Sequence, residues 1–225
     1  MHGLWIVRLS MSVRSYRMKE LKTMREFNIV LAGVGGQGTI LAAEILGTAA
    51  IKDKLNVRVS EIHGMAQRGG AVTSNVRIGD KVSSSTVPEG QADILLGFEP
   101  LETLRSLKFS SEKTLVIMSD ERIPPSELAA KNISYPSMDK IVEKINRFTK
   151  KVIIVQTEKL AKEAGSILTR NVILLGALAA IEKMPIKTES LMEAMKELVP
   201  AKHLEMNFKA FKLGFHFAEQ KASQF

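Results

Sequence analysis

The chain has 225 residues, of which 45% are hydrophobic and 25% are charged, a composition typical of a packed globular protein. It contains no cysteine, which excludes disulfides, thiolate nucleophiles and cysteine ligation of zinc or iron–sulfur clusters. The strongly apolar stretch at residues 172–181 is shorter than the roughly 20 residues that cross a bilayer, so we expect no transmembrane helix. The lack of cysteine also suits a reducing compartment, and we expect a cytoplasmic protein.

The formal net charge is +8, and much of it lies near the N-terminus. The basic residues there are Arg8, Arg14, Arg17, Lys19 and Lys22. We predict a disordered leader over residues 1–23, or a start upstream of the natural one; the alternative is a basic arm that touches an acidic partner. A single α/β domain over residues 24–225 follows. The other lysines are spread along predicted helix faces and aromatic residues make up only 5%, so we expect no nucleic-acid binding.

The hydrophobic pattern after residue 24 predicts strands that alternate with helices. Strands are expected at residues 27–32, 56–61, 71–78, 93–98, 114–118 and 151–156. Helices are expected at residues 39–50, 100–107, 137–148, 157–164, 169–183, 188–198 and 203–221. Gly79-Asp80 is a turn signal, which predicts a hairpin between residues 71–78 and 82–86. The order indicates a three-layer, Rossmann-like α/β sandwich with a mostly parallel sheet and a helical C-terminal third.

A glycine-rich motif, Gly33-Val34-Gly35-Gly36-Gln37-Gly38, joins the first predicted strand to the first helix. It matches G-x-G-x-x-G in the context that this motif requires, and free N–H groups at the helix start attract an anion. Glu61, at the end of the second predicted strand, stands where a ribose-binding acid would be expected, although somewhat late in the chain. The motif alone therefore indicates a nicotinamide or flavin enzyme, another phosphate site, or glycines that only allow close packing.

A second glycine-containing loop follows the second predicted strand, with the sequence His63-Gly64-Met65-Ala66-Gln67-Arg68-Gly69-Gly70. We expect it at the same edge of the sheet as the first loop, near the carboxyl ends of the strands, where ligands bind. Arg68 could offer a bidentate fork to a phosphate or carboxylate. His63 could carry a proton or could be a structural histidine.

The two loops, together and in this order, resemble the gamma-type subunit of 2-oxoacid:ferredoxin oxidoreductases. The sequence of residues 171–178 is also similar to a late helix of that family, and the resemblance extends over residues 24–220. Within the family the chain looks most like the indolepyruvate branch. The resemblance implies a component of an enzyme that oxidatively decarboxylates aryl pyruvates to an acyl-CoA and reduces ferredoxin.

The resemblance also implies which groups lie elsewhere in the complex. Thiamine diphosphate and the iron–sulfur clusters belong to a large partner subunit, in a hetero-oligomer for which two copies of each subunit is one arrangement. Ferredoxin is the electron acceptor of the complex, and coenzyme A is a further substrate. The lack of cysteine agrees, and Gly79-Asp80-Lys81 lacks the following glycine of a thiamine-diphosphate motif. We therefore expect no resident cofactor or metal in this chain and no activity of the chain alone.

The resemblance also implies that both loops contribute residues to a binding site. The first loop would contribute Gly35, Gly36, Gln37, Gly38 and Thr39. The second would contribute Gln67, Arg68, Gly69 and Gly70. Backbone N–H groups of the first loop would hold the phosphates of coenzyme A, or this loop would only pack at the interface. Arg68 would add charge, and His63, Met65 and Gln67 would shape the wall near thiamine diphosphate or the substrate. We expect no catalytic residue in this chain itself, although His63 and Arg68 could contribute to catalysis in the complex.

Two other functions stay open from the sequence. A stand-alone nicotinamide-dependent dehydrogenase would explain the fingerprint and Glu61, although the sequence offers no evident catalytic pair. A non-enzymatic nucleotide-binding subunit would also explain the glycine loop. Asn171 is expected to cap its helix, to pack, or to bond across an interface. Phe208, Phe211 and Phe215 form a stripe at helical spacing, which indicates core or a subunit contact.

Overall fold

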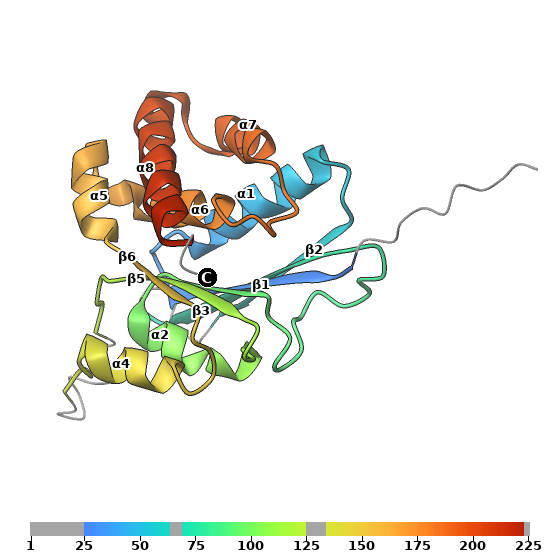
Figure 1. Ribbon diagram of the computed structural model, residues 1–225. Coiled ribbons are helices and arrows are strands. Elements are labelled where there is room, and N and C mark those ends of the chain that lie inside the picture. The colour runs from blue at the N-terminus through green and yellow to red at the C-terminus, as the bar shows by residue number, and fades with distance from the viewer. Residues whose placement is uncertain (1–24, 64–68, 125–133, 223–225) are drawn as a thin grey trace, which may run out of the picture.

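The computed structural model describes residues 25–63, 69–124 and 134–222 (Figure 1). One six-stranded sheet runs through the domain in the order β2-β3-β1-β4-β5-β6. The strands are β1 (Phe27–Val34), β2 (Val57–His63), β3 (Ala71–Ile78), β4 (Ile94–Gly97), β5 (Leu115–Ser119) and β6 (Val152–Val155). Strands β1, β4, β5 and β6 are parallel neighbours, and β3 is antiparallel to both β1 and β2. The predicted, mostly parallel Rossmann-like sheet is confirmed.

Helices cover both faces of the sheet, which gives three layers (Figure 1). One face carries α1 (Thr39–Lys52), α5 (Thr157–Ala164), α6 (Arg170–Ala179), α7 (Thr188–Leu198) and α8 (Leu204–Ala222). The other face carries α2 (Pro100–Arg105) and α4 (Met138–Ile145). Short 3₁₀ turns lie at Leu107–Phe109, Ile167–Thr169 and Ala201–His203. The core is therefore split into two apolar clusters, with the sheet between them.

Helices α6 and α8 approach each other closely because each contributes a glycine to the crossing. A side chain at Gly176 would meet the backbone of Phe211, and one at Gly214 would meet the backbone of Ile173. Phe211 itself is 1% exposed, so the expectation of a core position is confirmed for this ring. This packing positions α6, whose first turn lies near the carboxyl ends of β1, β4 and β5.

The predicted hairpin between residues 71–78 and 82–86 is wrong. Residues 82–86 belong to no strand, and β3 pairs with β2 on one side and β1 on the other. The segment crosses one face of β3, where Arg77 donates hydrogen bonds to the carbonyl groups of Ser84 and Thr86 over 3.0 and 3.2 Å. The buried guanidinium of Arg77 thus satisfies carbonyl groups that would pair with a neighbouring strand in a hairpin.

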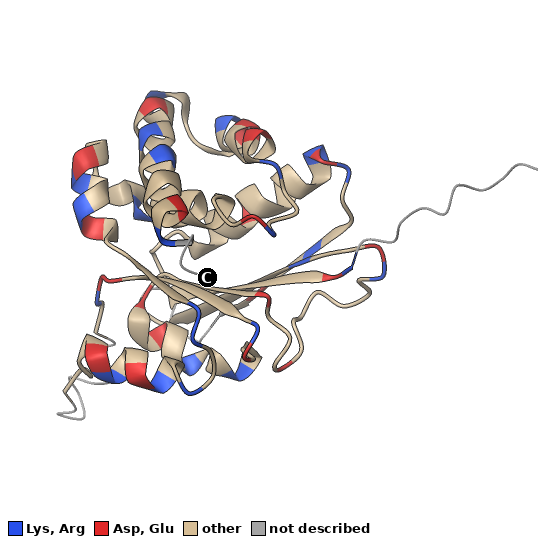
Figure 2. Ribbon diagram, in the orientation of Figure 1, with Lys and Arg blue, Asp and Glu red and all other residues tan. Residues whose placement is uncertain are grey.

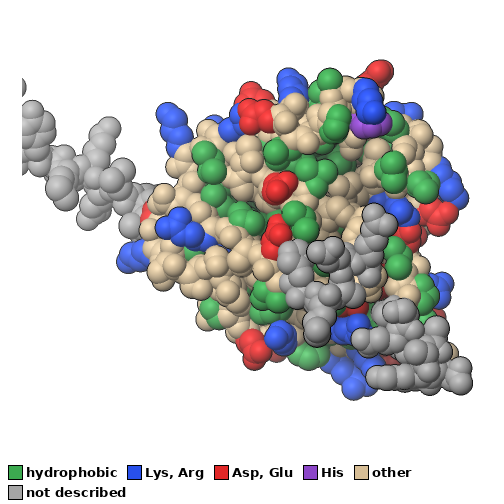
Figure 3. Space-filling view, turned by 180° about the vertical axis from the view of Figure 1, so that it is seen from behind, with side chains coloured by type: hydrophobic (Ala, Val, Ile, Leu, Met, Phe, Trp, Pro, Cys, Tyr) green, Lys and Arg blue, Asp and Glu red, His purple; other side chains and the backbone are tan. Residues whose placement is uncertain are grey.

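Charged residues of both signs are interspersed along α4, α5 and α8 (Figure 2). Seen from behind, apolar side chains reach the surface in small groups between charged ones (Figure 3). Within the described ranges, no helix is long and apolar enough to cross a membrane.

Candidate functional site

The first glycine loop connects β1 to α1 at the carboxyl edge of the parallel strands. Gly36 and Gly38 have φ angles of +102° and +77°, in the left-handed region that favours glycine. Gly33 fills a different need: a Cβ there would come within 2.8 Å of Cβ of Phe98 and 2.9 Å of Oε1 of Gln37. The motif therefore serves both a tight turn and a close approach of β1 to β4.

The side chain of Gln37 stabilises this loop through hydrogen bonds to the backbone. Its Oε1 accepts a hydrogen bond from the N–H of Val34 over 2.7 Å, and its Nε2 donates to the carbonyl oxygen of Phe98 over 2.9 Å. The amide thus joins the end of β1 to the end of β4. Both ends of this side chain are committed to the backbone, so we do not count Gln37 among side chains that could hold a ligand.

The second loop meets the first, as the sequence predicts. Gly35 donates to the carbonyl oxygen of Gly70 over 2.8 Å, and Gly69 donates back to the carbonyl oxygen of Gly35 over 3.4 Å. The backbone of His63 ends β2 opposite Val72. The expected contributions of Met65, Gln67 and Arg68 lie outside the described residues.

Helix α1 begins at this junction with unpaired hydrogen-bond donors. Its N-cap is Gly38, which has no side chain to offer, and no other side chain of the described residues caps it. The N–H groups of the first turn, starting at Thr39, have no acceptor within the helix. Thr39 is 3% exposed, and its Oγ1 has no hydrogen-bond partner in the part of the chain that the structure describes.

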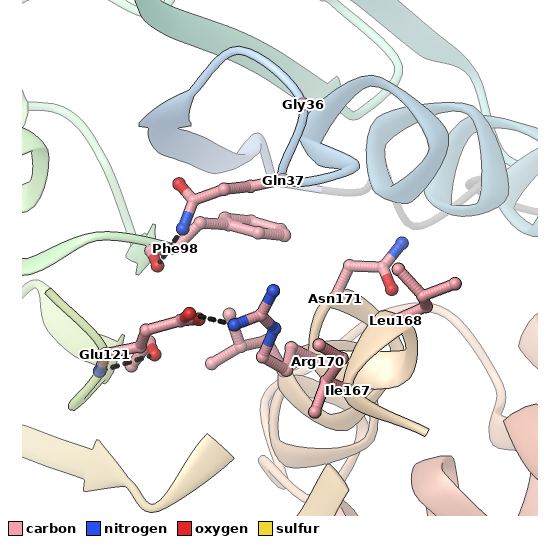
Figure 4. Close-up of a pocket in the computed structure, with 10 residues that line it drawn as sticks. Gly36, Gln37, Phe98, Glu121, Ile167, Leu168, Arg170 and Asn171 are labelled. Atoms are coloured by element: carbon pink, nitrogen blue, oxygen red, sulfur yellow. Dashed lines mark hydrogen bonds and ion pairs between the residues drawn. The ribbon is translucent and has the colours of Figure 1, made fainter. Parts of the chain in front are cut away.

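A pocket of about 50 Å³ lies between the starts of α1 and α6 (Figure 4). It is lined by Gly36, Gln37, Phe98, Ser119, Glu121, Ile167, Leu168, Arg170, Asn171 and Leu174. Five of them lie at or just after the carboxyl ends of β1, β4 and β5, where ligands bind in α/β sheets: Gly36, Gln37, Phe98, Ser119 and Glu121. The other five belong to the 3₁₀ turn at Ile167–Thr169 and to α6. Sequence reasoning found the glycine side of the pocket and not the opposite wall, which comes from α6.

Arg170 and Asn171 form that wall. Arg170 makes a half-buried ion pair with Glu121 through Nη1, and burial lowers the pKa of its guanidinium. Asn171 is only 7% exposed, and its amide has no hydrogen-bond partner among the described residues. Its amide faces Gly38, because a Cβ at Gly38 would lie 2.5 Å from Nδ2 of Asn171. Asn171 therefore packs against the N-terminus of α1, and the alternative that it caps its own helix is not realised.

The segment that carries Glu121 is fixed by a buried carboxylate. Glu99 is fully buried and accepts hydrogen bonds from the N–H of Ile123 over 3.3 Å and from the hydroxyl of Tyr135. Burial, together with this bond to Glu99, raises the pKa of Tyr135 well above its usual range, so the phenol stays a donor at any physiological pH. Glu99 also caps α2 by accepting from the N–H of Glu102 over 2.9 Å.

Glu61 does not stand where a ribose-binding acid would be needed. It pairs with Ser74 of β3, which in turn pairs with Leu31 of β1. Glu61 is therefore level with the middle of β1, and an antiparallel strand separates it from β1. In a dinucleotide-binding fold the corresponding acid ends the strand next to β1, so this support for a nicotinamide enzyme is lost.

A metal site would need several side chains of the described residues to bind the ion together. No group of three or more His, Asp or Glu side chains that could hold a metal ion occurs in residues 25–63, 69–124 and 134–222. The chain has no cysteine at all. The site is thus a small pocket rich in hydrogen-bond donors, with Glu121 as its acidic residue.

Comparisons with known proteins agree with this architecture. The family described as pyruvate ferredoxin/flavodoxin oxidoreductase matches residues 28–217. The indolepyruvate oxidoreductase subunit IorB of Pyrococcus horikoshii is 43% identical over 198 residues, which cover 88% of this chain and 98% of that one. The same subunit of Methanothermobacter thermautotrophicus is 42% identical over 194 residues, which cover 86% of this chain and 98% of that one.

A solved structure has the same fold. The gamma subunit of a keto/oxoacid ferredoxin oxidoreductase from Geobacter sulfurreducens superposes with a TM-score of 0.61 at 28% identity. The match covers 85% of this chain and 98% of that subunit. The fold, the glycine loop and the matched length together show that this chain belongs to the pyruvate ferredoxin/flavodoxin oxidoreductase family, among its gamma-type subunits.

Proposed function

We propose that this chain is the small subunit of a cytoplasmic indolepyruvate ferredoxin oxidoreductase. The complex oxidises an aryl pyruvate: carbon dioxide leaves, the acyl group forms a thioester with coenzyme A, and the electrons reduce ferredoxin. The observation that carries the proposal is the likeness to indolepyruvate oxidoreductase subunits over almost their whole length. Preference for indolepyruvate over other 2-oxoacids is part of the proposal.

The chemistry of decarboxylation and electron transfer belongs to a large partner subunit. Thiamine diphosphate supplies the carbanion chemistry there, and iron–sulfur clusters carry the electrons. This chain has no cysteine to ligate a cluster. Its own contribution is a surface at the carboxyl edge of the sheet, where Gly36, Gly38 and Thr39 present backbone N–H groups to the phosphates of coenzyme A. Gly35, Gly69 and Gly70 hold the two loops together behind that surface.

The test is dye reduction by the assembled enzyme. Viologen reduction that depends on indolepyruvate and coenzyme A is measured for this chain, for its large partner, and for the two co-expressed. We expect activity only in the co-expressed sample, together with co-purification of the two chains. Activity of the large partner alone at the same rate would contradict a role for this subunit.

The nicotinamide alternative is tested in the same preparation. Glu61 sits in mid-strand, and the pocket is too small for a dinucleotide, so we expect no binding of NAD by the isolated chain. Calorimetric titration with NAD checks this. Saturable binding of NAD, with no dye reduction by the co-expressed pair, would reverse the assignment.

A further inference from the structure

We propose that a hollow at the amino-terminal edge of the sheet binds an apolar organic anion, namely a carboxylate that carries an aryl or alkyl group. The hollow has a volume of about 770 Å³, within the roughly 300–1,000 Å³ that is usual for small-molecule sites. Its lining includes the first residues of β1, β4 and β5, so it lies at the opposite edge of the sheet from the glycine loop. The inference goes beyond the proposed function and does not depend on it.

One part of the lining is apolar. It combines the first residues of three parallel strands with the segment that follows α6: Phe27, Ile94, Leu115, Ala180, Ile181 and Pro185. Apart from Pro185, each of these side chains belongs to the core cluster on the α1 side of the sheet or packs against it. The apolar lining is therefore held in place by the core, and an aryl or alkyl group that covers it would leave water, which is favourable.

Four cations also line the hollow, and two of them have no partner. Lys113 and Lys151 make no side-chain hydrogen bond or ion pair in the parts of the chain that the structure describes. Arg25 and Lys183 attract the carboxyl group of Asp93 and oppose the rise in its pKa, but neither is hydrogen-bonded to it. All four side chains thus keep donors that a ligand can use.

The carboxylates of the lining do not cancel this charge. Glu26 forms an ion pair with the buried guanidinium of Arg77 over 2.6 Å, and Arg77 is not one of the cations of the hollow. Asp93 accepts a hydrogen bond from the N–H of Asn28 over 2.8 Å, and Glu182 is exposed. Four cations therefore face two carboxylates that are not already paired with a cation from outside the lining, which leaves a surplus of positive charge.

A second hollow adjoins the first one and lacks both features. It has a volume of about 710 Å³ and shares four charged residues with the first hollow, but Ala92 is the only apolar side chain in its lining. Glu112 adds a carboxylate there, and neither Lys151 nor Lys183 reaches it. We therefore place the site in the first hollow alone.

The combination of the two features selects the ligand class. An inorganic anion would pair with the lysines but would leave the apolar residues in water. A neutral arene would cover the apolar residues but would leave the lysines without an acceptor. A carboxylate with an aryl or alkyl group does both, because charge-assisted hydrogen bonds hold one end while the other end is buried.

The test is calorimetric titration of the full-length chain with 4-phenylbutyrate, at an ionic strength held constant with chloride. We expect saturable binding with one site per chain. Two further probes separate the contributions: 4-phenylbutanamide keeps the phenyl group and loses the charge, whereas acetate keeps the charge and loses the phenyl group. Each should bind at least about tenfold more weakly than 4-phenylbutyrate.

The variant Lys113→Gln/Lys151→Gln locates the site. It should weaken the binding of 4-phenylbutyrate by about tenfold or more and should leave the binding of 4-phenylbutanamide unchanged, because only the charged probe uses the lysines. Lys150→Gln is the matched control, since this lysine precedes Lys151 in the chain but is exposed and does not line the hollow. Circular dichroism shows whether each variant is folded.

Three results would overturn the proposal. The first is the absence of saturable 4-phenylbutyrate binding by the wild type. The second is equally tight binding of 4-phenylbutyrate and 4-phenylbutanamide, which would show that the cations take no part. The third is an equal effect of Lys150→Gln and of the double variant, which would place the bound anion elsewhere on the surface. The comparison of probes on the wild type keeps the test decisive even if the double variant unfolds.

Discussion

Gln37 donates a hydrogen bond from its side-chain amide to the main-chain carbonyl oxygen of Phe98 over 2.9 Å, and so ties the glycine loop to the end of β4. The same amide accepts from the N–H of Val34, a buried residue. The loop is thereby held in a single shape before any ligand arrives. Such preorganisation matters for a site built from backbone N–H groups, because their directions are fixed by the turn itself.

We expect Gln37→Met to destabilise the fold. Methionine keeps the length of the side chain but leaves the N–H of Val34 without an acceptor, at a cost of about 1–3 kcal/mol in the free energy of unfolding. Urea unfolding followed by circular dichroism measures the loss. Gln156→Met is the control, since the side chain of Gln156 is exposed and makes no capping bond. Equal stability of the two variants would contradict the bridging role of Gln37.

The contact between Gly38 and Asn171 gives a prediction about coupling. Gly38→Ala combines a strained positive φ with a Cβ placed 2.5 Å from Nδ2 of Asn171, and we expect a loss of about 2–4 kcal/mol in the free energy of unfolding. Asn171→Ala removes the clashing amide. The double variant should therefore recover about 1–2 kcal/mol relative to the sum of the two single variants, a coupling typical of residues in contact.

Gly36→Ala is the matched control for that cycle. Its φ is also positive, but a Cβ at Gly36 would meet no atom within 4 Å. It should cost only the backbone strain, about 1–2 kcal/mol, and should show no coupling to Asn171→Ala. Additive behaviour at both glycines would mean that Asn171 does not lie against Gly38 in solution.

The sequence predicts most of the elements because their patterns are local. Helices α5 and α7 begin and end at the predicted residues, and each strand of the parallel part lies within about one or two residues of its expected place. The hairpin prediction was wrong because of a tertiary interaction. Arg77 is buried and donates hydrogen bonds to the crossing segment, and no local sequence pattern indicates such a contact.

The candidate site divides in the same way. Gly35 and Gly70 could be placed together because the ends of neighbouring strands share one edge of the sheet. The position of Arg170 and Asn171 could not be predicted, because α6 reaches the glycine loop only through its packing on α8. The one signal available was Asn171 at a helix start. The predicted roles of Asn171, capping its helix or packing, did not identify Gly38 as its neighbour.

Gly176→Ala tests the packing that positions α6. A methyl group there would press on the backbone of Phe211, which cannot yield as a flexible side chain can, so we expect a loss of about 1–3 kcal/mol in the free energy of unfolding. Gly47→Ala is the matched change in α1. It would meet only Cγ2 of Val59 at 2.9 Å, on a side chain that is 39% exposed. We expect it to be near neutral, since alanine favours the helix by about 1 kcal/mol. A harmless Gly176→Ala would contradict the close crossing of the two helices.

The last prediction concerns pH and Asp93, at the opposite, amino-terminal edge of the sheet. Burial raises the pKa of its carboxyl above the ordinary value of 3.8, against the smaller opposing effect of a hydrogen bond from the N–H of Asn28 at 2.8 Å. The folded chain therefore holds this proton more tightly than the unfolded chain does. The resulting stabilisation is complete below the ordinary pKa and is lost as pH rises through the raised one.

Asp93→Asn removes the titratable carboxyl group but retains a side-chain oxygen that can accept a hydrogen bond from the N–H of Asn28. We therefore expect the wild type to gain stability relative to Asp93→Asn as pH falls from about 7 toward about 4, where a carboxyl of raised pKa takes up its proton. Urea unfolding of both proteins at a series of pH values gives the difference in the free energy of unfolding. A difference that is flat over this range, or that grows in favour of the variant at low pH, would show that Asp93 is not held in a desolvated position in the folded chain.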